Sequence, residues 1–403
     1  MKNKPDIRFD GFNYAWELRK FEDLLDDKEG VRRGPFGSAL KKEFFVESSD
    51  YVVYEQQNAI YDNYETRYNI TEEKYKELNR FNLDTGDFIM SGAGTIGRIS
   101  RVPDGIKTGV FNQALIRFRI NDEITDPEYF IQFIRADKMQ KNLTGANPGS
   151  AITNLVPMTE VKKWDILVPC KNEQTQIGAF FQFLDNLITL HQRELENYKL
   201  LKKGFSQKLF PSNGDTNPSI RFDGFTDAWE LRRLGELAKI TMGQSPNSEN
   251  YTENPTDHIL VQGNADMKNG RVFPRVWTTQ ITKTADKNDL ILSVRAPVGD
   301  VGKTDYNVVL GRGVAAIKGN EFLFQLLGKM KENGYWTKLS TGSTFDSINS
   351  NDIKKAEILL PRADEQDKIG LFLANLDTLI TLHQRELDNY KELKKGFLQK
   401  MFV

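Results

Sequence analysis

Apolar residues recur at alternating steps of four and three along two long stretches of this chain, residues 173–210 and 365–402. Charged or polar residues fill the intervening positions, and the pattern lasts for about four to five heptads, which is typical of a coiled-coil seam. The first seam consists of Ile177, Phe181, Leu184, Ile188, His191, Leu195, Tyr198, Lys202, Phe205 and Leu209. The second consists of Ile369, Leu373, Leu376, Ile380, His383, Leu387, Tyr390, Lys394, Phe397 and Met401. The pattern predicts two long helices.

The two predicted helices are copies of one another. Their core, LITLHQREL, is identical, and mostly conservative changes separate the rest. Two matching long helices in one chain most simply pack on each other. His191 and His383 occupy equivalent seam positions, and they touch only if a local two-fold axis passes between them. We interpret them as packing or register residues, with pH sensing and metal binding as open alternatives.

Between the helices the apolar runs are short, and Gly and Pro punctuate them. Residues 82–102 and 286–304 are each predicted to form a strand, a Gly-rich turn and a second strand. In both regions a β-like run, a short amphipathic helix, a small polar turn (149–155 and 342–348) and a last strand follow. Pro169 and Pro361 are expected to end that strand. These features predict a mainly β or α+β fold.

A second repeat precedes each variable region: IRFDGFNYAWELRKFEDL at 7–24 and IRFDGFTDAWELRRLGEL at 220–237. The chain therefore consists of two tandem units, each made of an opener, a variable domain and a long helix. We predict an opener at 1–20, a first variable domain at 21–170, a first helix at 171–210, a linker with the second opener at 211–233, a second variable domain at 234–362 and a second helix at 363–403.

Composition narrows the class of protein only slightly. The chain has 403 residues, 39% of them hydrophobic and 28% charged, as in an ordinary globular protein with several domains. Its net charge of −1 gives no global argument for nucleic-acid binding, so a DNA-binding face must come from local clustering. Cys170 is the only cysteine, which excludes an internal disulfide framework and favours the cytoplasm. We expect no membrane span, because no apolar run approaches about 18 residues.

Two glycine-rich segments imitate nucleotide-binding motifs. Residues 92–97, GAGTIG, match the dinucleotide fingerprint, and residues 297–304, PVGDVGKT, nearly match a phosphate loop. Both motifs require a helix directly after the loop to hold phosphate, and neither segment is followed by a good helix start. We interpret both as tight turns between strands.

No catalytic or metal-binding set is evident in the sequence. The three histidines do not cluster along the chain, and a single thiol rules out thiolate zinc sites. A methyltransferase acting on an exocyclic amine would be expected to carry Asp-Pro-Pro-Tyr or Asn-Pro-Pro-Phe, and neither tetrapeptide occurs. We predict no catalytic residue, no cofactor and no metal site in this chain. The alternatives are an enzyme with an unrecognised site and a coiled-coil scaffold that does not read DNA.

Polar and basic side chains in predicted turns are the candidates for contact with DNA. Arg and Lys near glycine-rich turns can approach phosphate, and amide side chains can pair bidentately with adenine. The predicted DNA-contacting residues are Arg32, Arg33, Lys41, Lys42, Arg98, Arg101, Lys107, Asn112, Gln113, Asn147, Gln244, Gln262, Asn264, Arg295, Lys303 and Asn349. The alternative is an ordinary solvated loop surface.

The openers, the divergent domains with GPFGS at 34–38 and GDFIMS at 86–91, and the copied helices ending in KKGFxQK(L/M)F resemble the specificity subunit of type I restriction–modification enzymes. The resemblance covers essentially the whole chain. It implies an α+β fold of two β-rich target-recognition domains in a pseudo-two-fold inverted arrangement, separated by an antiparallel coiled coil. It also implies a non-catalytic subunit that binds double-stranded DNA. The implied partners are two modification subunits, which use S-adenosylmethionine, and two restriction subunits, which use ATP and Mg²⁺.

Chain order independently favours antiparallel helices. A helix of about 37 residues is roughly 55 Å long. The second variable domain connects the end of the first helix to the start of the second, so parallel helices would force it to span that whole length. We therefore expect an asymmetric, bipartite DNA site whose halves are separated by roughly one turn of duplex, about 34 Å, or somewhat less.

The seam becomes polar toward the end of each helix, where lysines gather. We expect this end, together with the outer helix faces, to bind helices of the modification subunits. The predicted docking residues are Tyr198, Lys202, Lys203, Tyr390, Lys394 and Lys395.

Overall fold

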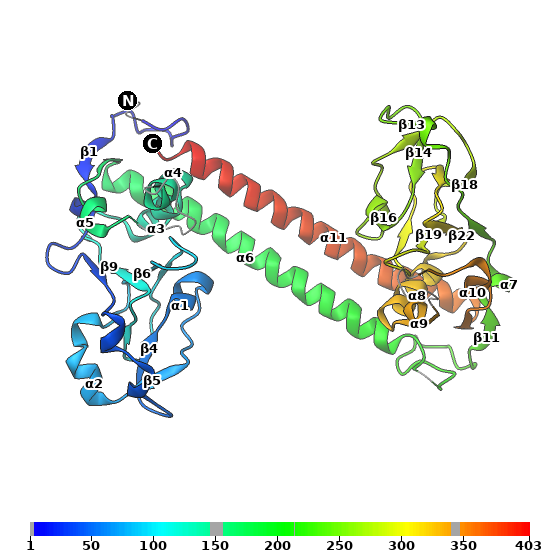
Figure 1. The fold of residues 1–403 in the computed structure, drawn as a ribbon, viewed down its shortest axis with the longest axis horizontal. Helices are drawn as coiled ribbons and strands as arrows, with labels where there is room; N and C mark the ends of the chain where they lie inside the picture. Colours follow the sequence, from blue (N-terminus) through cyan, green and yellow to red (C-terminus); the bar gives the residue numbers. More distant parts are fainter. Residues whose placement is uncertain (1–3, 146–155, 213, 340–346) are drawn as a thin grey trace. The chain divides into compact units, whose positions relative to one another are not determined.

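The computed structural model describes residues 4–145, 156–212, 214–339 and 347–403. It divides into two compact units: residues 1–190 with 387–403 form unit 1, and residues 191–386 form unit 2. Each unit contains one variable domain and parts of both long helices (Figure 1). The predicted polar turn at 149–155, and residues 342–346 of its counterpart, lie outside the described residues.

The predicted long helices are α6 (Lys171–Lys208) and α11 (Ala363–Lys400). Every predicted seam position is buried or half-buried. In unit 1 the start of α6 packs against the end of α11, and the rings of Phe180 and Phe397 lie 4.9 Å apart (Figure 1). In unit 2 the end of α6 packs against the start of α11, and Phe205 and Phe372 lie 4.9 Å apart. The helices are therefore antiparallel in each unit, which confirms the prediction. None of the described helices is long and apolar enough to cross a membrane.

The variable domain of unit 1 is built on short strands, as the apolar pattern predicted. One sheet has the order β2 (Val31–Arg33), β9 (Leu115–Phe118), β6 (Phe88–Ser91), β7 (Ile99–Arg101). A second has the order β3 (Phe45–Val46), β5 (Tyr68–Ile70), β4 (Tyr51–Tyr54), β8 (Gly109–Phe111). The short helices are α1 (Gln56–Tyr61), α2 (Glu72–Glu77), α3 (Pro127–Arg135), α4 (Asp137–Thr144) and α5 (Met158–Val161). The side chain of Asp126 accepts two backbone N–H bonds at the start of α3, whose apolar face packs on β6 and β9.

Unit 2 repeats this plan with different residues. One sheet has the order β12 (Ile240–Met242), β22 (Val314–Ile317), β19 (Leu290–Ser293), β20 (Val301–Lys303), β16 (Arg271–Val272), β15 (Met267–Lys268). The other has the order β13 (Tyr251–Thr252), β17 (Trp277–Thr278), β14 (His258–Val261), β21 (Val308–Leu310), β18 (Lys283–Ala285). The helices of this domain are α7 (Leu234–Leu237), α8 (Glu321–Glu332), α9 (Tyr335–Leu339) and α10 (Ser350–Lys354). Asn320 caps α8, which covers β19 and β22 as α3 covers β6 and β9.

The first glycine-rich segment, residues 92–97, is a turn between strands, as predicted; the second, residues 297–304, begins in such a turn and continues into β20. Residues 92–98 connect β6 to β7, and residues 294–300 connect β19 to β20. In each turn a buried serine at the end of the strand bonds turn carbonyls: Ser91 Oγ donates to Thr95 O at 2.5 Å, and Ser293 Oγ donates to Pro297 O at 2.7 Å. The two units thus share these serine hydrogen bonds although the turn sequences differ.

Each opener clamps the end of one long helix to the start of the other within its unit. In unit 1 the Ile7 N–H donates to the carbonyl of Lys400 at 3.1 Å, and Arg8 forms two bonds to Glu173, at 2.6 and 2.7 Å. Unit 2 repeats both contacts, from Ile220 to Lys208 at 3.0 Å and from Arg221 to Glu365 at 2.7 and 2.8 Å. Glu173 and Glu365 are fully buried, so these bidentate pairs satisfy charges that burial would otherwise penalise.

The openers also contribute strands that the sequence did not reveal. β1 (Glu17–Lys20) pairs antiparallel with β10 (Asp165–Val168), and β11 (Glu230–Arg233) pairs with β23 (Glu357–Leu360). β10 and β23 end directly before Pro169 and Pro361, as expected.

Candidate nucleic-acid interface

The loop after β2 and the turn before β9 lie against each other in unit 1. A Cβ atom on Gly34 would lie 1.9 Å from the carbonyl oxygen of Asn112, so only glycine permits this close approach. Asn112 uses its side-chain oxygen to accept the Ala114 N–H at 3.0 Å, which shapes the turn and leaves Gln113 exposed at its tip. The result is a depression of about 180 Å³ whose polar lining includes Lys42, Glu55, Asn112 and Gln113.

Unit 2 has an open depression at the equivalent place. A Cβ atom on Gly243 would lie 2.0 Å from the carbonyl oxygen of Gly311, so the loop after β12 approaches the turn before β22 just as closely. The Arg312 N–H donates to Ser245 Oγ at 3.1 Å and ties loop to turn. The depression has a volume of about 330 Å³ and is lined by Ser245, Gln262, Gly263, Asn264, Arg295, Ala296, Arg312 and Gly313.

The backbone pairing shows that the two depressions are equivalent although their side chains differ. The Asn112 N–H donates to Tyr54 O in unit 1, and the Gly311 N–H donates to Val261 O in unit 2. Glu55 therefore corresponds to Gln262, since each follows the accepting residue. The carboxylate of Glu55 in unit 1, which only accepts hydrogen bonds, thus stands where unit 2 has the amide of Gln262. Such a difference suits surfaces that recognise different base edges.

Several predicted DNA-contacting residues are exposed and extend from loops or turns. Gln113 lines the first depression, Arg295 lines the second, and Gln244 lies in the loop after β12. The exposed predicted residues are Arg33, Lys41, Lys42, Arg98, Arg101, Lys107, Gln113, Gln244, Arg295 and Asn349. Asn264 is half-buried in the second depression, where Gln262 donates to the hydroxyl of Tyr251 at 2.9 Å.

Some of the predicted residues have contacts within the chain. Arg101 pairs with Glu128 at 3.1 Å, and Lys303 pairs with Glu321 at 3.4 Å. Asn349 caps α10 by accepting two backbone N–H bonds. Asn147 lies outside the described residues.

Arg312 is a candidate that sequence reasoning missed. It stands between two glycines in the turn that follows the apolar run of β21, and that position was the available signal.

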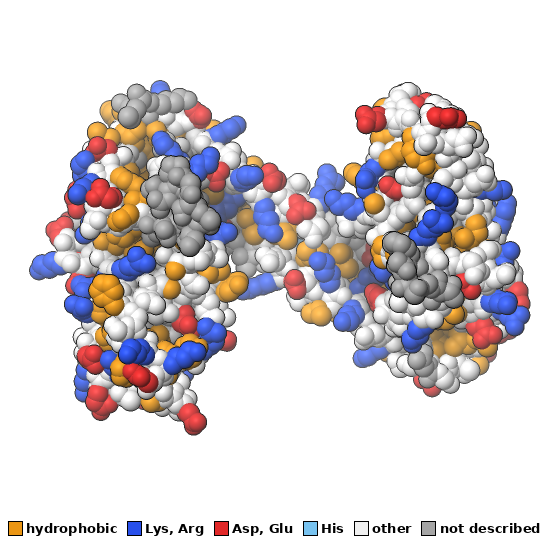
Figure 2. All heavy atoms as spheres, viewed as in Figure 1, with side chains coloured by type: hydrophobic (Ala, Val, Ile, Leu, Met, Phe, Trp, Pro, Cys, Tyr) orange, Lys and Arg blue, Asp and Glu red, His pale blue; other side chains and the backbone are white. Residues whose placement is uncertain are grey.

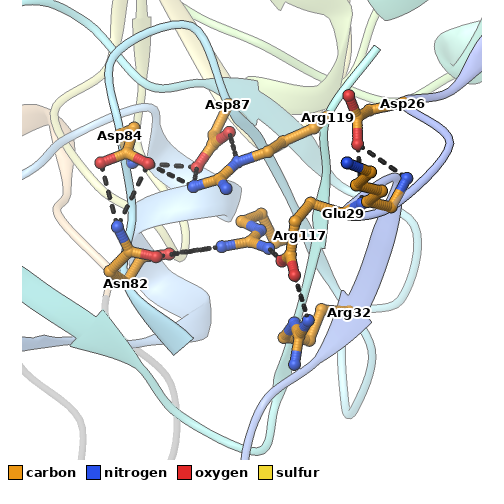
Figure 3. Close-up of polar contacts among 9 residues, drawn as sticks. Asp26, Glu29, Arg32, Asn82, Asp84, Asp87, Arg117 and Arg119 are labelled. Carbon is orange, nitrogen blue, oxygen red and sulfur yellow. Dashed lines mark hydrogen bonds and ion pairs between the residues drawn. The ribbon is translucent and has the colours of Figure 1, made fainter. Parts of the chain in front are cut away.

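Arg32 belongs to a charge network inside the sheet of unit 1 (Figure 3). It faces Arg117 across the β2–β9 pairing, and both guanidinium groups bond to Glu29, at 2.6 and 2.5 Å. Arg117 is fully buried and also donates to the carbonyl of Asn82 at 2.9 Å. Burial lowers the pKa of Arg117. Burial alone would raise the pKa of Glu29, but the hydrogen bond from Arg117 and the charges of Arg32 and Arg117 outweigh it and lower that pKa.

Lysines and arginines on the visible surface are interspersed with acidic side chains on each unit (Figure 2). Neither unit shows a face of uniformly positive charge in this view, which agrees with the net charge of −1. Recognition at the depressions would therefore depend on particular side chains more than on a broad positive field.

Some of the predicted docking residues form ion pairs within the chain, and others are exposed. Lys202 pairs with Asp377 at 2.5 Å in unit 2, and Lys394 pairs with Asp185 at 2.6 Å in unit 1. Burial lowers the pKa of Lys394, although Asp185 opposes that effect. Lys203 and Lys395 are exposed. The remaining two are half-buried: Tyr198 stacks on His383 with ring centroids 5.1 Å apart, and Tyr390 packs against the core of unit 1.

Comparison with known proteins agrees with this architecture. The family model for the type I restriction modification DNA specificity domain matches twice, at residues 16–199 and 226–391. A Methanocaldococcus jannaschii protein named for the MjaX type I restriction enzyme specificity subunit is 29% identical over 340 residues, which is 81% of this chain and 79% of that protein. The MjaIX specificity subunit of the same organism is 25% identical over 191 residues, covering 43% of this chain and 44% of its own.

Solved structures show the same fold. The S subunit of the type I restriction-modification system from M. genitalium has a TM-score of 0.68 and 16% identity, and the match covers 99% of both chains. A chain from a structural study of complex assembly and conformational transition in a type I R-M system has a TM-score of 0.55 and 21% identity, over 96% of this chain and 97% of that one. The duplicated α+β architecture and the two family matches lead to one conclusion: this chain belongs to the type I restriction–modification DNA specificity family.

Proposed function

We propose that this chain reads an asymmetric, bipartite DNA site, with one half-site for each variable domain. The observation that carries the proposal is the pair of equivalent depressions. The backbone frame is the same in both, down to the glycine that permits loop and turn to touch, while the lining changes from Lys42, Glu55 and Gln113 to Gln262, Arg295 and Arg312. A shared frame with different polar groups fits two readers of different sequences.

The helix pair is proposed to set the distance between the half-sites. Antiparallel packing of α6 on α11 within each unit supports this role. Matching four-residue insertions in both helices add about 6 Å each, and one base-pair step rises about 3.4 Å. Methylation-site mapping should then show a spacer about one or two base pairs longer, with both half-sites unchanged. An unchanged spacer would refute the ruler role.

The chain is proposed to leave catalysis to modification and restriction subunits and to recruit them through the helices. Exposed leucines repeat at equivalent places, Leu190 with Leu382 and Leu201 with Leu393. Reversing Lys202 or Lys394 would break ion pairs within the chain, so the clean variants are Lys203→Glu with Lys395→Glu, and Leu201→Asp with Leu393→Asp. Either pair should weaken pull-down of the modification subunit, whereas Arg98→Glu, far along the chain in a turn, should not. Undiminished pull-down by both pairs would contradict docking at this surface.

The primary test is methylation-site mapping in a host that carries this chain with its modification subunits. The proposal predicts one bipartite, asymmetric motif. Purified chain incubated alone with labelled S-adenosylmethionine and duplex should transfer no methyl group, and transfer would favour the enzyme alternative. Absence of duplex binding in the presence of modification subunits would favour a scaffold.

A further inference from the structure

Two histidines and two glutamates meet between α6 and α11 in unit 2. His191 and Glu194 lie about one turn apart on α6, and His383 and Glu386 occupy the equivalent positions on α11. The imidazole side chains are mostly buried, with 14% and 13% exposed, while the carboxylates remain 39% and 37% exposed. The site is therefore enclosed by the helices yet open to small solutes on its carboxylate side.

One potential ligand atom each of His191, His383 and Glu386 lies within 4.8 Å of the other two, and Glu194 approaches both histidines. Nδ1 of His191 lies 3.2 Å from Nδ1 of His383 and 3.1 Å from a carboxylate oxygen of Glu386. Nδ1 of His383 lies 3.2 Å from an oxygen of Glu194. Each nitrogen is also 3.7 or 3.9 Å from the carboxylate on its own helix. A tetrahedral zinc site with bonds of about 2.0 Å has edges of about 3.3 Å, so these separations are close to those of a metal site.

Protons and a metal ion would compete for these four groups. Ionised carboxylates only accept hydrogen bonds, and a neutral imidazole has one N–H. One proton can bridge the two nitrogens at 3.2 Å, or each Nδ1–H can donate to the carboxylate of the opposite helix, at 3.1 and 3.2 Å. A divalent cation can replace these protons, because two neutral imidazoles and two carboxylates offer four lone pairs and a charge that balances the metal.

The donor set arises from the duplication of the helix. His-x-x-Glu occurs once in each identical LITLHQREL segment. Equivalent residues touch only where a local two-fold axis relates the two helices, and the histidine pair marks that place. Tyr198 stacks on the ring of His383 at 5.1 Å with planes 21° apart and so helps to fix its orientation. Facing helices that each present a carboxylate and a histidine one turn apart are a known way to build metal sites in bundles.

We propose that His191, His383 and Glu386, with Glu194 beside them as a candidate fourth ligand, bind one divalent transition metal of the zinc type and thereby fix the register of the helix pair. Imidazole ligands favour zinc and its neighbours, whereas Mg²⁺ prefers all-oxygen octahedral sites and should not compete. The sequence left metal binding by these histidines only as an alternative to packing, because the two residues are 192 positions apart and meet only through antiparallel packing.

The test uses the purified full-length chain, treated with a chelator and titrated with Zn²⁺ alone. One Zn²⁺ should bind per chain and raise the thermal unfolding midpoint, while Mg²⁺ at the same concentration has no effect. Co²⁺ should give the intense visible bands of four-coordinate cobalt. His191→Gln and His383→Gln should each weaken Zn²⁺ binding by more than about 100-fold, since loss of a direct ligand exceeds the 10- to 100-fold cost of losing a supporting residue.

Two control variants address the remaining metal-binding groups. His258→Gln changes the third histidine, on β14, and Cys170→Ser changes the exposed thiol; both should bind Zn²⁺ like the original chain. Glu386→Gln keeps size and helix propensity and should weaken binding even if a histidine variant lost helical circular dichroism. The proposal is overturned if the original chain shows no saturable 1:1 binding, or if both histidine variants, folded, bind with unchanged affinity.

Discussion

The sheets of the two variable domains differ in charge at one buried position. Arg117 on β9 is fully buried and bonded to Glu29, whereas the equivalent residue on β22 is Ala316, also buried. The strand neighbour of Arg117 is Arg32 in unit 1, and that of Ala316 is Thr241 in unit 2. One domain thus encloses a charge network where the other has small and neutral side chains. The interior of this fold therefore accommodates either a buried charge network or small, neutral side chains at this position.

The contacts that join each domain to the helices show the opposite behaviour. Arg8 with Glu173 corresponds to Arg221 with Glu365. Lys394 and Gln132 bond Asp185 in unit 1, as Lys202 and Gln325 bond Asp377 in unit 2. The contrast indicates that the contacts among domain, opener and long helices are constrained. The interior of each variable domain can differ wherever the glycine geometry and the strand pairing are kept.

Replacing Gly34 or Gly243 should produce the largest loss of stability, and the loss should be similar in the two units. Gly34→Ala and Gly243→Ala each place a methyl group about 2 Å from a backbone carbonyl oxygen, so each should destabilise its own sheet by about 3 kcal/mol or more. Hydrogen exchange should show β9 amides opening more easily in the first variant and β22 amides in the second. A large loss in only one unit would show that the two loops are not equivalent.

Glu29→Ala should destabilise unit 1 by about 2 to 3 kcal/mol, because it leaves the buried Arg117 with only its bonds to Asn82. The opening free energy of β9 should fall while that of β22 stays constant. Adding Arg117→Met removes the unpaired charge and should recover part of the loss. If the double variant were less stable than Glu29→Ala, the network would be a net source of stability and not a tolerated alternative to Ala316.

Lowering the pH should reduce the stability of unit 1 through protonation of Glu29. Because the pKa of Glu29 is lowered in the folded chain, its ionised form contributes stability that is complete above the ordinary glutamate pKa of about 4.3 and is lost as the pH falls through the lower folded value. The thermal midpoint of the original chain should therefore exceed that of Glu29→Gln at about pH 7, and the difference should shrink toward about pH 3. A difference that grows on acidification would contradict the assignment.

Periodicity predicted the parts of the fold that are governed by local physics. The 4-3 seams placed both long helices, and short apolar runs with glycine turns placed β6, β7, β19 and β20, because burial of one face imposes those spacings. The strands β1 and β11 were missed. They pair with β10 and β23, far along the chain, and nothing local in the openers signals a strand.

The site was less accessible to sequence reasoning. Side-chain type alone cannot separate Arg295, which is exposed, from Arg32, which is held by Glu29. That distinction depends on strand register, which sets Arg32 opposite Arg117. Asn349 was a reasonable DNA-contact candidate by chemistry, yet its amide caps α10. The meeting of His191 with His383 likewise depends on where the antiparallel helices cross.

Methylation-site mapping with domain-specific variants tests most directly whether the two depressions read separate half-sites. Gln262→Ala with Arg312→Ala should relax or alter one half of the motif, and Gln113→Ala with Lys42→Ala the other. A lost bidentate contact costs about 1 to 3 kcal/mol, or roughly tenfold to a hundredfold in discrimination. The expected result is that each pair of substitutions changes one half-site and leaves the other half and the spacer intact. Variants that are incorporated into the complex but leave the motif unchanged, or that alter both halves together, would contradict the claim.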